Sequence, residues 1–225
     1  MSDIRFDGRV AIVTGAGGGL GRSHALLLAS RGAKVVVNDL GGGRDGEGKP
    51  SSEMANKVVE EIKAAGGEAV ADAHGVDTHE GGESIVKSAM DAFGKVDIVI
   101  ANAGILRDRA FHNLTEEDWD KIFAVHVKGS FNVIQPAFRI MRQNNYGRII
   151  VTTSNAGLYG NFGQGNYSSA KTALLGLAST LELEDLYWIA AQSVSDLSGG
   201  LPGVFLLFQP HREGLIAKAT SANAG

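Results

Sequence analysis

The sequence contains no cysteine, which excludes disulfides, thiolate zinc sites and cysteine nucleophiles. No apolar run approaches the roughly 18 residues of a membrane span. The N-terminal residues form no signal-peptide apolar segment, so we do not expect secretion. The formal net charge of −4 disfavours a nucleic-acid partner, which would require a clustered basic face. We predict no metal site.

The chain is long enough to bury a sizeable core. Its 225 residues correspond to one large domain or two small ones, and 44% of them are hydrophobic while 20% are charged. These values are close to the average of globular proteins, so disorder of the whole chain is not expected. Glycine is the outlying residue type, at 31.

Short apolar runs alternate with amphipathic stretches along residues 8–182. The pattern predicts strands over 10–13, 33–38, 68–73, 96–101 and 148–153, and helices over 20–30, 58–65, 85–93, 116–143 and 167–181. The long helical pattern is interrupted by Gly129 and Pro136. Alternation of strands and helices indicates a parallel sheet, and continuous apolar strands indicate helices on both faces. We therefore predict an α/β fold: a Rossmann-type doubly wound parallel sheet in a single domain.

A glycine cluster, T-G-A-G-G-G-L-G at residues 14–21, lies between the first predicted strand and the first predicted helix. Glycines at such a turn let the backbone approach a pyrophosphate, and the helix N-terminus supplies free N–H groups. The strand before it and the helix after it are the context that this motif requires. The alternative is a tight strand-to-helix turn without a ligand.

Asp39 ends the second predicted strand. A carboxylate there accepts hydrogen bonds from the adenosine ribose hydroxyls and repels a 2′-phosphate, which favours NAD over NADP. The alternative for Asp39 is a solvated charge at a strand end. The glycine-rich segment 40–52 that follows is predicted to be a surface loop, and its Arg44 is the residue that could accommodate NADP.

Two further segments follow predicted strands at the edge where open α/β sheets bind ligands. After the third strand, Val76 could flank an adenine and Asp77 could bond to it, although Asp77 also suits the start of a helix. After the fourth strand, Asn102 begins an Asn-Ala-Gly segment whose small residues leave room for a ribose. An ordinary Asn/Gly turn is the alternative.

Tyr167 and Lys171 are spaced by one helical turn, which places them on one face. A tyrosine with an ordinary pKa of about 10 is a poor base, and a nearby ammonium favours its phenolate. Such a tyrosine can exchange a proton with an alcohol or a carbonyl. Ser154, at the end of the preceding strand, could donate a hydrogen bond to the substrate oxygen. The spacing alone also fits a surface pair.

The order of these motifs resembles the short-chain dehydrogenase/reductase family over about residues 6–182. Within it, residues 5–10, 37–42, 102–108 and 159–164 resemble the dehydrogenase domains of type 2 peroxisomal multifunctional enzymes. The resemblance implies oxidation of a (3R)-3-hydroxyacyl-CoA to the 3-ketoacyl-CoA with NAD in β-oxidation. It also implies a homodimer, for which the small residues of 167–181 are suited, and a peroxisomal location.

The resemblance also implies roles for matching residues. Ser154 would bind the substrate oxygen, Tyr167 would be the acid/base, and Lys171 would hold the nicotinamide ribose and tune Tyr167. The residues that would hold the cofactor, with Tyr167 and Lys171, are Gly15, Gly19, Leu20, Gly21, Asp39, Gly75, Val76, Asp77 and Asn102.

His126 departs from the wider family, which carries an asparagine here that supports a water between the lysine and solvent. A histidine can serve the same relay because it donates and accepts. The alternative is a histidine that packs in a helix interface.

The segment from residue 183 onward departs further. We divide the chain into an NAD-binding domain at 1–182 and an atypical tail at 183–225, with a sheet that ends after its fifth strand and leaves one edge exposed. Residues 204–208 are apolar enough to act as a substitute strand. The C-terminal residues are no Ser-Lys-Leu signal, which leaves a cytoplasmic location open. An NADP-linked 3-ketoacyl reductase and a non-catalytic nucleotide-binding remnant remain the alternative functions.

Overall fold

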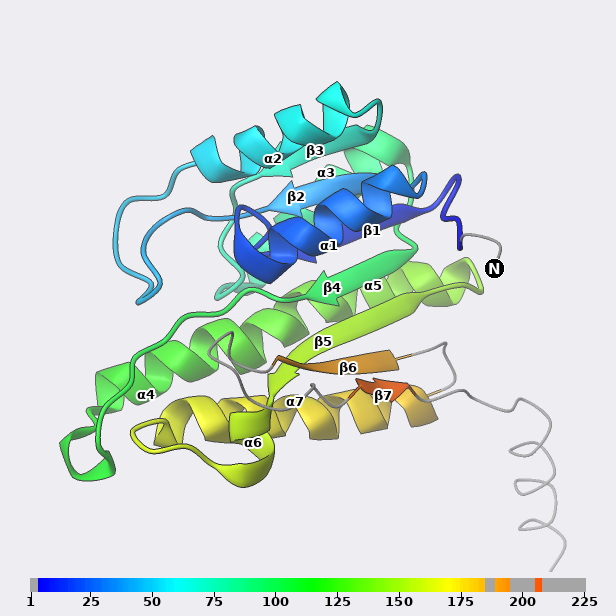
Figure 1. Cartoon of the computed structure of the whole chain (residues 1–225). Coiled ribbons are helices and arrows are strands. Elements are labelled where there is room, and N and C mark those ends of the chain that lie inside the picture. Colours follow the sequence, from blue (N-terminus) through cyan, green and yellow to red (C-terminus); the bar gives the residue numbers. More distant parts are fainter. Residues whose placement is uncertain (1–3, 185–188, 195–204, 208–225) are drawn as a thin grey trace, which may run out of the picture.

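A seven-stranded sheet forms the centre of the protein (Figure 1). The structure, a computed structural model, describes residues 4–184, 189–194 and 205–207. The strand order is β3-β2-β1-β4-β5-β6-β7. The strands are β1 (Val10–Thr14), β2 (Lys34–Asn38), β3 (Glu68–Asp72), β4 (Ile98–Ala101), β5 (Arg148–Ser154), β6 (Ile189–Val194) and β7 (Phe205–Leu207). All neighbours from β3 to β6 are parallel, and β7 is antiparallel to β6.

The order in which strands are added to the sheet changes side between β1 and β4. From β1 the chain proceeds to β2 and β3 on one side, and then returns to place β4 and β5 on the other. This reversal opens a crevice at the carboxyl ends of β1 and β4, where open α/β sheets bind ligands. The prediction of a doubly wound parallel sheet is confirmed.

Helices cover both faces of this sheet (Figure 1). In β1, Ala11 and Val13 pack with α1 (Gly19–Ser30) and α2 (Glu53–Ala64), while Val10 and Ile12 pack on the opposite face. That opposite face is covered by α3 (His79–Phe93), α5 (Gly129–Gln143) and α7 (Gly165–Leu183). Burial of both faces explains why the strands are continuous apolar runs.

The long helical pattern folds as two α-helices joined without a break. A π-helical turn, Ala124–Lys128, connects α4 (Glu116–Phe123) to α5, and the helix continues through Gly129 and Pro136. Thr115 caps α4, since its hydroxyl accepts a hydrogen bond from the Asp118 N–H at 3.1 Å. A π-helical turn inside a helix is a common feature of functional sites.

Gly82 lets α3 and α5 approach closely. Proline has no N–H, so Pro136 leaves the carbonyl of Asn132 without its helical donor. A Cβ atom at Gly82 would lie 2.2 Å from that carbonyl oxygen, so only glycine fits the crossing. The carbonyl that the proline leaves without a donor therefore faces the backbone of α3 at Gly82.

Several boundaries differ from the sequence-based expectation. Helix α2 begins at Glu53 and α3 at His79, both earlier than the apolar periodicity indicates, because their first turns are polar and Thr78 caps α3. The short helix α6 (Asn155–Tyr159) was not predicted. It begins after Ser154, whose hydroxyl accepts a hydrogen bond from the Ala156 N–H at 3.2 Å.

The predicted end of the sheet after its fifth strand is wrong. Strand β6 pairs along β5 in parallel from Ile149↔Ile189 to Ser154↔Val194, so its backbone groups satisfy the edge of β5. The substitute strand expected at 204–208 corresponds to β7, which pairs with β6. The sequence does not predict β6, because its residues carry no strong apolar pattern. The rest of residues 183–225 beyond Glu184, β6 and β7 lies outside the described residues, and the domain division at 182 stays a prediction.

Among the described helices, none is both long enough and apolar enough to span a membrane.

We expect Gly82→Ala to lower the free energy of unfolding by about 2 kcal/mol, because the added methyl group forces α3 away from Asn132. Urea denaturation measures this value. Glu83→Ala, an exposed substitution at the next position of the same helix, is the control and should change stability by less than about 0.5 kcal/mol. Equal effects of the two substitutions would contradict the close crossing.

Candidate active site

The glycine turn between β1 and α1 depends on two positive φ angles and two close approaches. Gly15 has φ +62° and Gly19 has φ +52°, which favour glycine. A Cβ atom at Gly21 would lie 2.2 Å from the Gly15 carbonyl oxygen, and one at Gly17 would lie 2.7 Å from Asp39 Oδ2. No side chain caps α1, so its first N–H groups are not engaged by a capping residue. The turn is therefore shaped to present backbone N–H groups to an anion.

Asp39 connects the glycine turn to the loop that follows β2. Its Oδ2 accepts a hydrogen bond from the Gly17 N–H and its Oδ1 accepts one from the Gly41 N–H, both at 2.8 Å. These contacts use one lone pair on each oxygen and leave acceptor capacity on both. The carboxylate is partly exposed and faces the cavity described below.

Asn102 supports the glycine turn from β4. Its Nδ2 donates to the carbonyl oxygens of Thr14 and Gly15, at 3.0 and 3.2 Å. The Thr14 hydroxyl oxygen accepts from the N–H groups of Asn102 and Ala103, each at 3.0 Å. The predicted Asn-Ala-Gly segment therefore fixes the turn as well as bordering the cavity.

A cavity of about 500 Å³ lies at the carboxyl ends of β1, β2 and β4. Six of the predicted cofactor-binding residues line it: Gly15, Gly19, Asp39, Val76, Asp77 and Asn102. The remaining five do not: Leu20, Gly21, Gly75, Tyr167 and Lys171. Gly21 acts instead in packing, and Leu20 is 38% exposed. Asp77 lies 3.8 Å from Lys121, so its carboxylate has a cationic neighbour at the rim.

A buried polar cluster that the sequence did not predict lies at the end of β3. Asp72 accepts hydrogen bonds from Asn38 Nδ2 at 2.8 Å and from Ser88 Oγ at 2.6 Å, and it contacts His74 Nδ1 at 2.9 Å. These hydrogen bonds, first that of Ser88 and then those of His74, outweigh burial and lower the pKa of Asp72. The cluster holds Asn38 and His74 at the cavity wall. Its sequence signal was the acidic residue at the buried end of a strand.

Tyr167 and Lys171 lie close together on α7. The Lys171 ammonium is 5.5 Å from the centroid of the Tyr167 ring. Lys171 is buried and donates to the Thr152 carbonyl oxygen at 2.7 Å, and burial lowers its pKa to about 7. Thr153 Oγ1 donates to the Lys171 carbonyl at 2.8 Å, which fixes α7 against β5. Ser154 ends β5 on the same strand.

His126 packs edge-on against Tyr167, with the ring centroids 5.4 Å apart. The π-helical turn presents it beneath the segment after β4, where a Cβ atom at Gly104 would lie 2.5 Å from the imidazole. Its Nε2 contacts the Ile105 N–H and carbonyl oxygen, at 3.1 and 2.9 Å. Burial, and then the charge of Lys171, lowers the pKa of His126 to about 3, so the imidazole is neutral near pH 7. Its buried Nδ1 has no hydrogen-bond partner in the described part of the chain.

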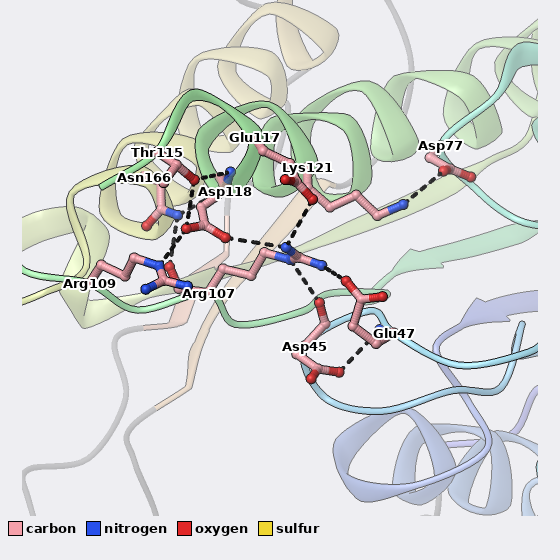
Figure 2. A network of polar contacts seen from close by, with 10 residues as sticks. All are labelled: Asp45, Glu47, Asp77, Arg107, Arg109, Thr115, Glu117, Asp118, Lys121 and Asn166. Atoms are coloured by element: carbon pink, nitrogen blue, oxygen red, sulfur yellow. Dashed lines mark hydrogen bonds and ion pairs between the residues drawn. The ribbon is translucent and has the colours of Figure 1, made fainter. Parts of the chain in front are cut away.

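A network of ionic contacts not predicted from the sequence borders this region (Figure 2). Asp118 is buried and accepts hydrogen bonds from Arg109 Nε at 2.6 Å, Thr115 Oγ1 at 2.8 Å and Arg107 Nη1 at 3.2 Å. The hydrogen bond of Thr115, followed by those of Arg109 and Arg107, lowers the pKa of the Asp118 carboxyl. No sequence motif marks these residues, because their contacts form only when the segment after β4 folds against α4.

No cluster of three or more histidine or acidic side chains suited to a metal ion occurs in residues 4–184, 189–194 and 205–207.

Comparison with known proteins identifies the family. The family model described as short chain dehydrogenase matches residues 9–195, which extends through β6. The chain belongs to the short-chain dehydrogenase family. It therefore carries the fold of oxidoreductases that act on CH–OH groups, and the resemblance inferred from its motifs is confirmed.

Its relatives include enzymes named as multifunctional. Peroxisomal multifunctional enzyme type 2 of Mus musculus is 57% identical over 183 residues, which cover 81% of this chain and 24% of that enzyme. The solved structure of full-length peroxisomal multifunctional enzyme type 2 from Drosophila melanogaster matches with a TM-score of 0.71 and 45% identity. That match covers 88% of this chain and 32% of the other, so the chain corresponds to only part of these proteins.

A further solved structure contains a nicotinamide cofactor. It is a 7α-hydroxysteroid dehydrogenase in complex with NADH and 7-oxo glycochenodeoxycholic acid, with a TM-score of 0.73 and 31% identity over 80% of this chain and 66% of the other. A nicotinamide cofactor is thereby indicated for this family member.

We expect Lys171→Met to stabilise the fold more at pH 7 than at pH 10. In the unfolded chain the lysine keeps its proton up to about 10.5, whereas in the folded chain it loses the proton near pH 7. Between these values the unfolded chain binds more protons, so the stability of the wild type rises with pH, and the cost of burying the charge is fully present below about pH 7.

The substitution should raise the Tm at pH 7 by about 2–4 °C, which corresponds to about 1 kcal/mol, and have a smaller effect at pH 10. Differential scanning calorimetry measures both values. Lys63→Met, on an exposed face of α2, is the control. A gain in Tm that is the same at both pH values would contradict a buried lysine with a lowered pKa.

Proposed function

We propose that the protein transfers a hydride between NAD and a 3-hydroxyacyl-CoA/3-ketoacyl-CoA pair, as a dehydrogenase domain of fatty-acid β-oxidation. The observation that carries this proposal is the grouping of Tyr167, Lys171 and His126 on buried elements next to the crevice that holds the glycine turn. The high identity to peroxisomal multifunctional enzymes supports the choice of substrate class.

The residues present fit a dinucleotide. The glycine turn leaves uncapped N–H groups at α1, and the absent Cβ atoms of Gly15 and Gly17 keep the turn close to β4 and Asp39. We propose that this turn binds the pyrophosphate, that Asp39 accepts the ribose hydroxyls of the adenosine, and that Val76 and Asp77 border the adenine. Leu20, Gly21 and Gly75 support these groups through the backbone of their turns.

Asn102, which lines this cavity, and Lys171, which lies beyond it, are proposed to border the nicotinamide ribose. A protonated lysine has three N–H donors, and in the described structure Nζ donates to the Thr152 carbonyl, which leaves donors for a ligand. The buried Thr152 Oγ1 and His126 Nδ1 atoms also have no partner among the described residues. Unpartnered buried polar atoms are costly, and a bound ligand or water at this position would satisfy them.

Tyr167 is proposed to move the proton. When bound, NAD supplies the acceptor for the hydride that leaves the carbinol carbon, and the hydroxyl proton passes to the Tyr167 oxygen. The ammonium of Lys171 lies 5.5 Å from the ring and stabilises the phenolate while it is protonated. Ser154 is proposed to hold the substrate oxygen with its hydroxyl, which is already oriented by the Ala156 N–H.

His126 is proposed to connect Lys171 to a proton acceptor. It is neutral, it packs against Tyr167, and its Nδ1 is free to accept a hydrogen bond from a water. In the reverse direction, the same groups return the proton to Tyr167, which then donates it to a carbonyl.

An apolar rim supports an acyl chain as part of the substrate. Phe111 is 77% exposed and Phe162 is 90% exposed, and the segments that carry them lie side by side because the Arg109 N–H donates to the Gly163 carbonyl at 2.8 Å. Large exposed apolar side chains at one rim are typical of a binding surface. Phe111 also lies at the start of the helix that carries Tyr167, since a Cβ atom at Gly165 in the first turn of α7 would lie 3.1 Å from the Phe111 ring.

The location and assembly are further proposals. We propose a peroxisomal location because the relatives are named as peroxisomal enzymes. We also propose a homodimer through the outer face of α7, where Ala173 and Gly176 are exposed while Ala170 and Ala178 pack inward. A Cβ atom at Gly176 would meet no described atom within 4 Å, which leaves room for a partner helix. Sedimentation velocity tests the dimer, and a monomer at micromolar concentration would contradict it.

We expect Tyr167→Phe to reduce turnover of a 3-hydroxyacyl-CoA by at least about 10²-fold, because the phenol oxygen carries the proton while the ring preserves packing against His126. The dissociation constant for NADH should change by less than about threefold, as fluorescence titration would measure. The control is Tyr146→Phe, at a ring that packs under Arg9 and Arg148 away from the crevice. A Tyr167→Phe enzyme with more than about a tenth of the wild-type rate would exclude this role.

We expect NAD to bind more tightly than NADP by about tenfold or more, because the Asp39 carboxylate repels a 2′-phosphate. Asp39→Asn removes the charge and should bring the dissociation constants for the two cofactors closer together. Arg44→Gln should move them further apart if Arg44 attracts the phosphate. Fluorescence titration with both reduced cofactors measures the ratios. Equal or tighter binding of NADPH by the wild type would favour the alternative function, an NADP-linked 3-ketoacyl reductase, and binding of a cofactor without any turnover would favour the non-catalytic nucleotide-binding remnant.

A further inference from the structure

The loop between β2 and α2 forms one wall of the cavity and folds on itself through two main-chain hydrogen bonds, from the Gly43 N–H to the Glu47 carbonyl at 2.7 Å and from the Gly46 N–H to the Gly43 carbonyl at 3.0 Å. Gly41, Gly42, Gly43, Arg44 and Gly46 line the cavity. Positive φ angles occur at Gly41, Gly42, Gly46 and Gly48, where glycine loses the most conformational freedom on ordering. The position of this loop, residues 41–48, therefore depends on contacts with other segments.

Those contacts come from the segment that follows β4. The Leu106 N–H donates to the Arg44 carbonyl at 2.8 Å, and Arg107 Nε donates to the Asp45 carbonyl at 3.0 Å. Arg107 Nη2 also forms an ion pair with Glu47. Two main-chain carbonyls and one carboxylate of the loop are thus held by two consecutive residues, and Arg107 makes two of the three contacts (Figure 2).

Arg107 is itself fixed by the body of the protein. Its side chain is only 12% exposed, although Glu47 is 66% exposed, and its Nη1 donates to the buried Asp118 at 3.2 Å. Asp118 is anchored by Thr115 and Arg109. Because Asp118 on α4 holds the Arg107 guanidinium in place, the contacts of that guanidinium restrain the position of the loop.

The same network reaches the backbone of the proposed acid/base. Asn166 Nδ2 donates to the carbonyl oxygens of Arg107 and Asp118, at 3.0 and 3.2 Å. Asn166 Oδ1 accepts a hydrogen bond from the Tyr167 N–H at 2.8 Å. The loop, the segment after β4 and the start of α7 are therefore held in register through one connected group of contacts.

We propose that Arg107 is a positioning residue for the cofactor: through Asp45 and Glu47 it holds the loop 41–48 against the cavity, in register with the start of α7. This inference rests on the proposed function in that the cavity is taken to bind a dinucleotide. Arginine suits the role because its planar fork donates to three partners at once, which the single ammonium of a lysine cannot do in the same geometry. Arg107 touches no reacting atom and acts only through the loop.

The rate of cleavage by trypsin measures how firmly the loop is held, and this measurement needs no cofactor. The loop contains one bond that trypsin can cut, after Arg44, because Lys49 is followed by Pro50. Mass spectrometry of the full chain during limited digestion measures the rate at which the peptide starting at Asp45 appears. We expect Glu47→Gln to accelerate this cleavage about threefold and Arg107→Gln about tenfold, because each removes charged contacts that hold the loop closed.

Cofactor binding and steady-state kinetics give the second readout. The dissociation constant for NADH should rise by similar factors, about threefold and about tenfold, whereas kcat at saturating cofactor should change by less than about twofold. Arg107→Lys should recover part of the loss, because it keeps the charge facing Asp118. Asp118 retains Arg109 and Thr115 in every variant, so the Tm should stay within about 2 °C of the wild type.

Glu61→Gln is the matched control, because it removes an exposed ion pair with Arg22 on the outer surface of α1 and α2. It should change neither the cleavage after Arg44 nor the NADH affinity. Cleavage and affinity that are unchanged in Glu47→Gln and Arg107→Gln, in a wild type that binds NADH, would overturn this inference alone. A wild type that binds neither NADH nor NADPH would overturn the proposed function and the cofactor role of Arg107 with it. A fall in kcat without a change in affinity would also overturn the inference.

Discussion

The close contact of α1 with the end of β1 is the constraint on which the site depends. Gly21 lies so near the Gly15 carbonyl that no side chain fits between them, and this distance sets how far the first helix stands from the sheet. The uncapped N-terminus of α1 then points into the crevice beside β4. Asp39 and Asn102 bind to the same turn from its two sides, so the walls of the cavity take their positions from it.

The sequence predicted the fold well because its strongest signals are repeated. Strands β1, β2, β4 and β5 are short, largely buried apolar runs, the edge strand β3 has a weaker pattern, and a helix follows each of them. Patterns of this kind are local, so they can be recognised in the sequence without knowing which residues are in contact. Strand β6 escaped prediction because Ala190, Ala191, Gln192 and Ser193 have no strong strand pattern, and pairing along β5 is a non-local property.

The candidate site was predicted only where a motif carries its own geometry. The glycine turn, Asp39 and the Tyr167–Lys171 pair belong to such motifs, and the structure brings them to neighbouring positions at one end of the sheet. The roles of Asp72 and Arg107 depend on partners that are distant in sequence, such as Ser88 and Glu47, and no spacing indicates these pairs. The same limit applies to the π-helical turn that holds His126, since its residues read as an ordinary helix.

The hydroxyl of Thr14 makes all of its hydrogen bonds to the backbone of the protein. Its hydroxyl oxygen accepts from two N–H groups at the end of β4 and donates toward the Ile100 carbonyl at 3.4 Å. A hydroxyl has one hydrogen to donate and two lone pairs to offer, so its capacity is filled within the protein. No solvent molecule or ligand can recruit it, and valine, although equal in shape, would leave the N–H groups of Asn102 and Ala103 without this acceptor. Among the standard amino acids, serine alone offers the same short hydroxyl. Few substitutions are therefore compatible with this position, although it takes no part in the reaction.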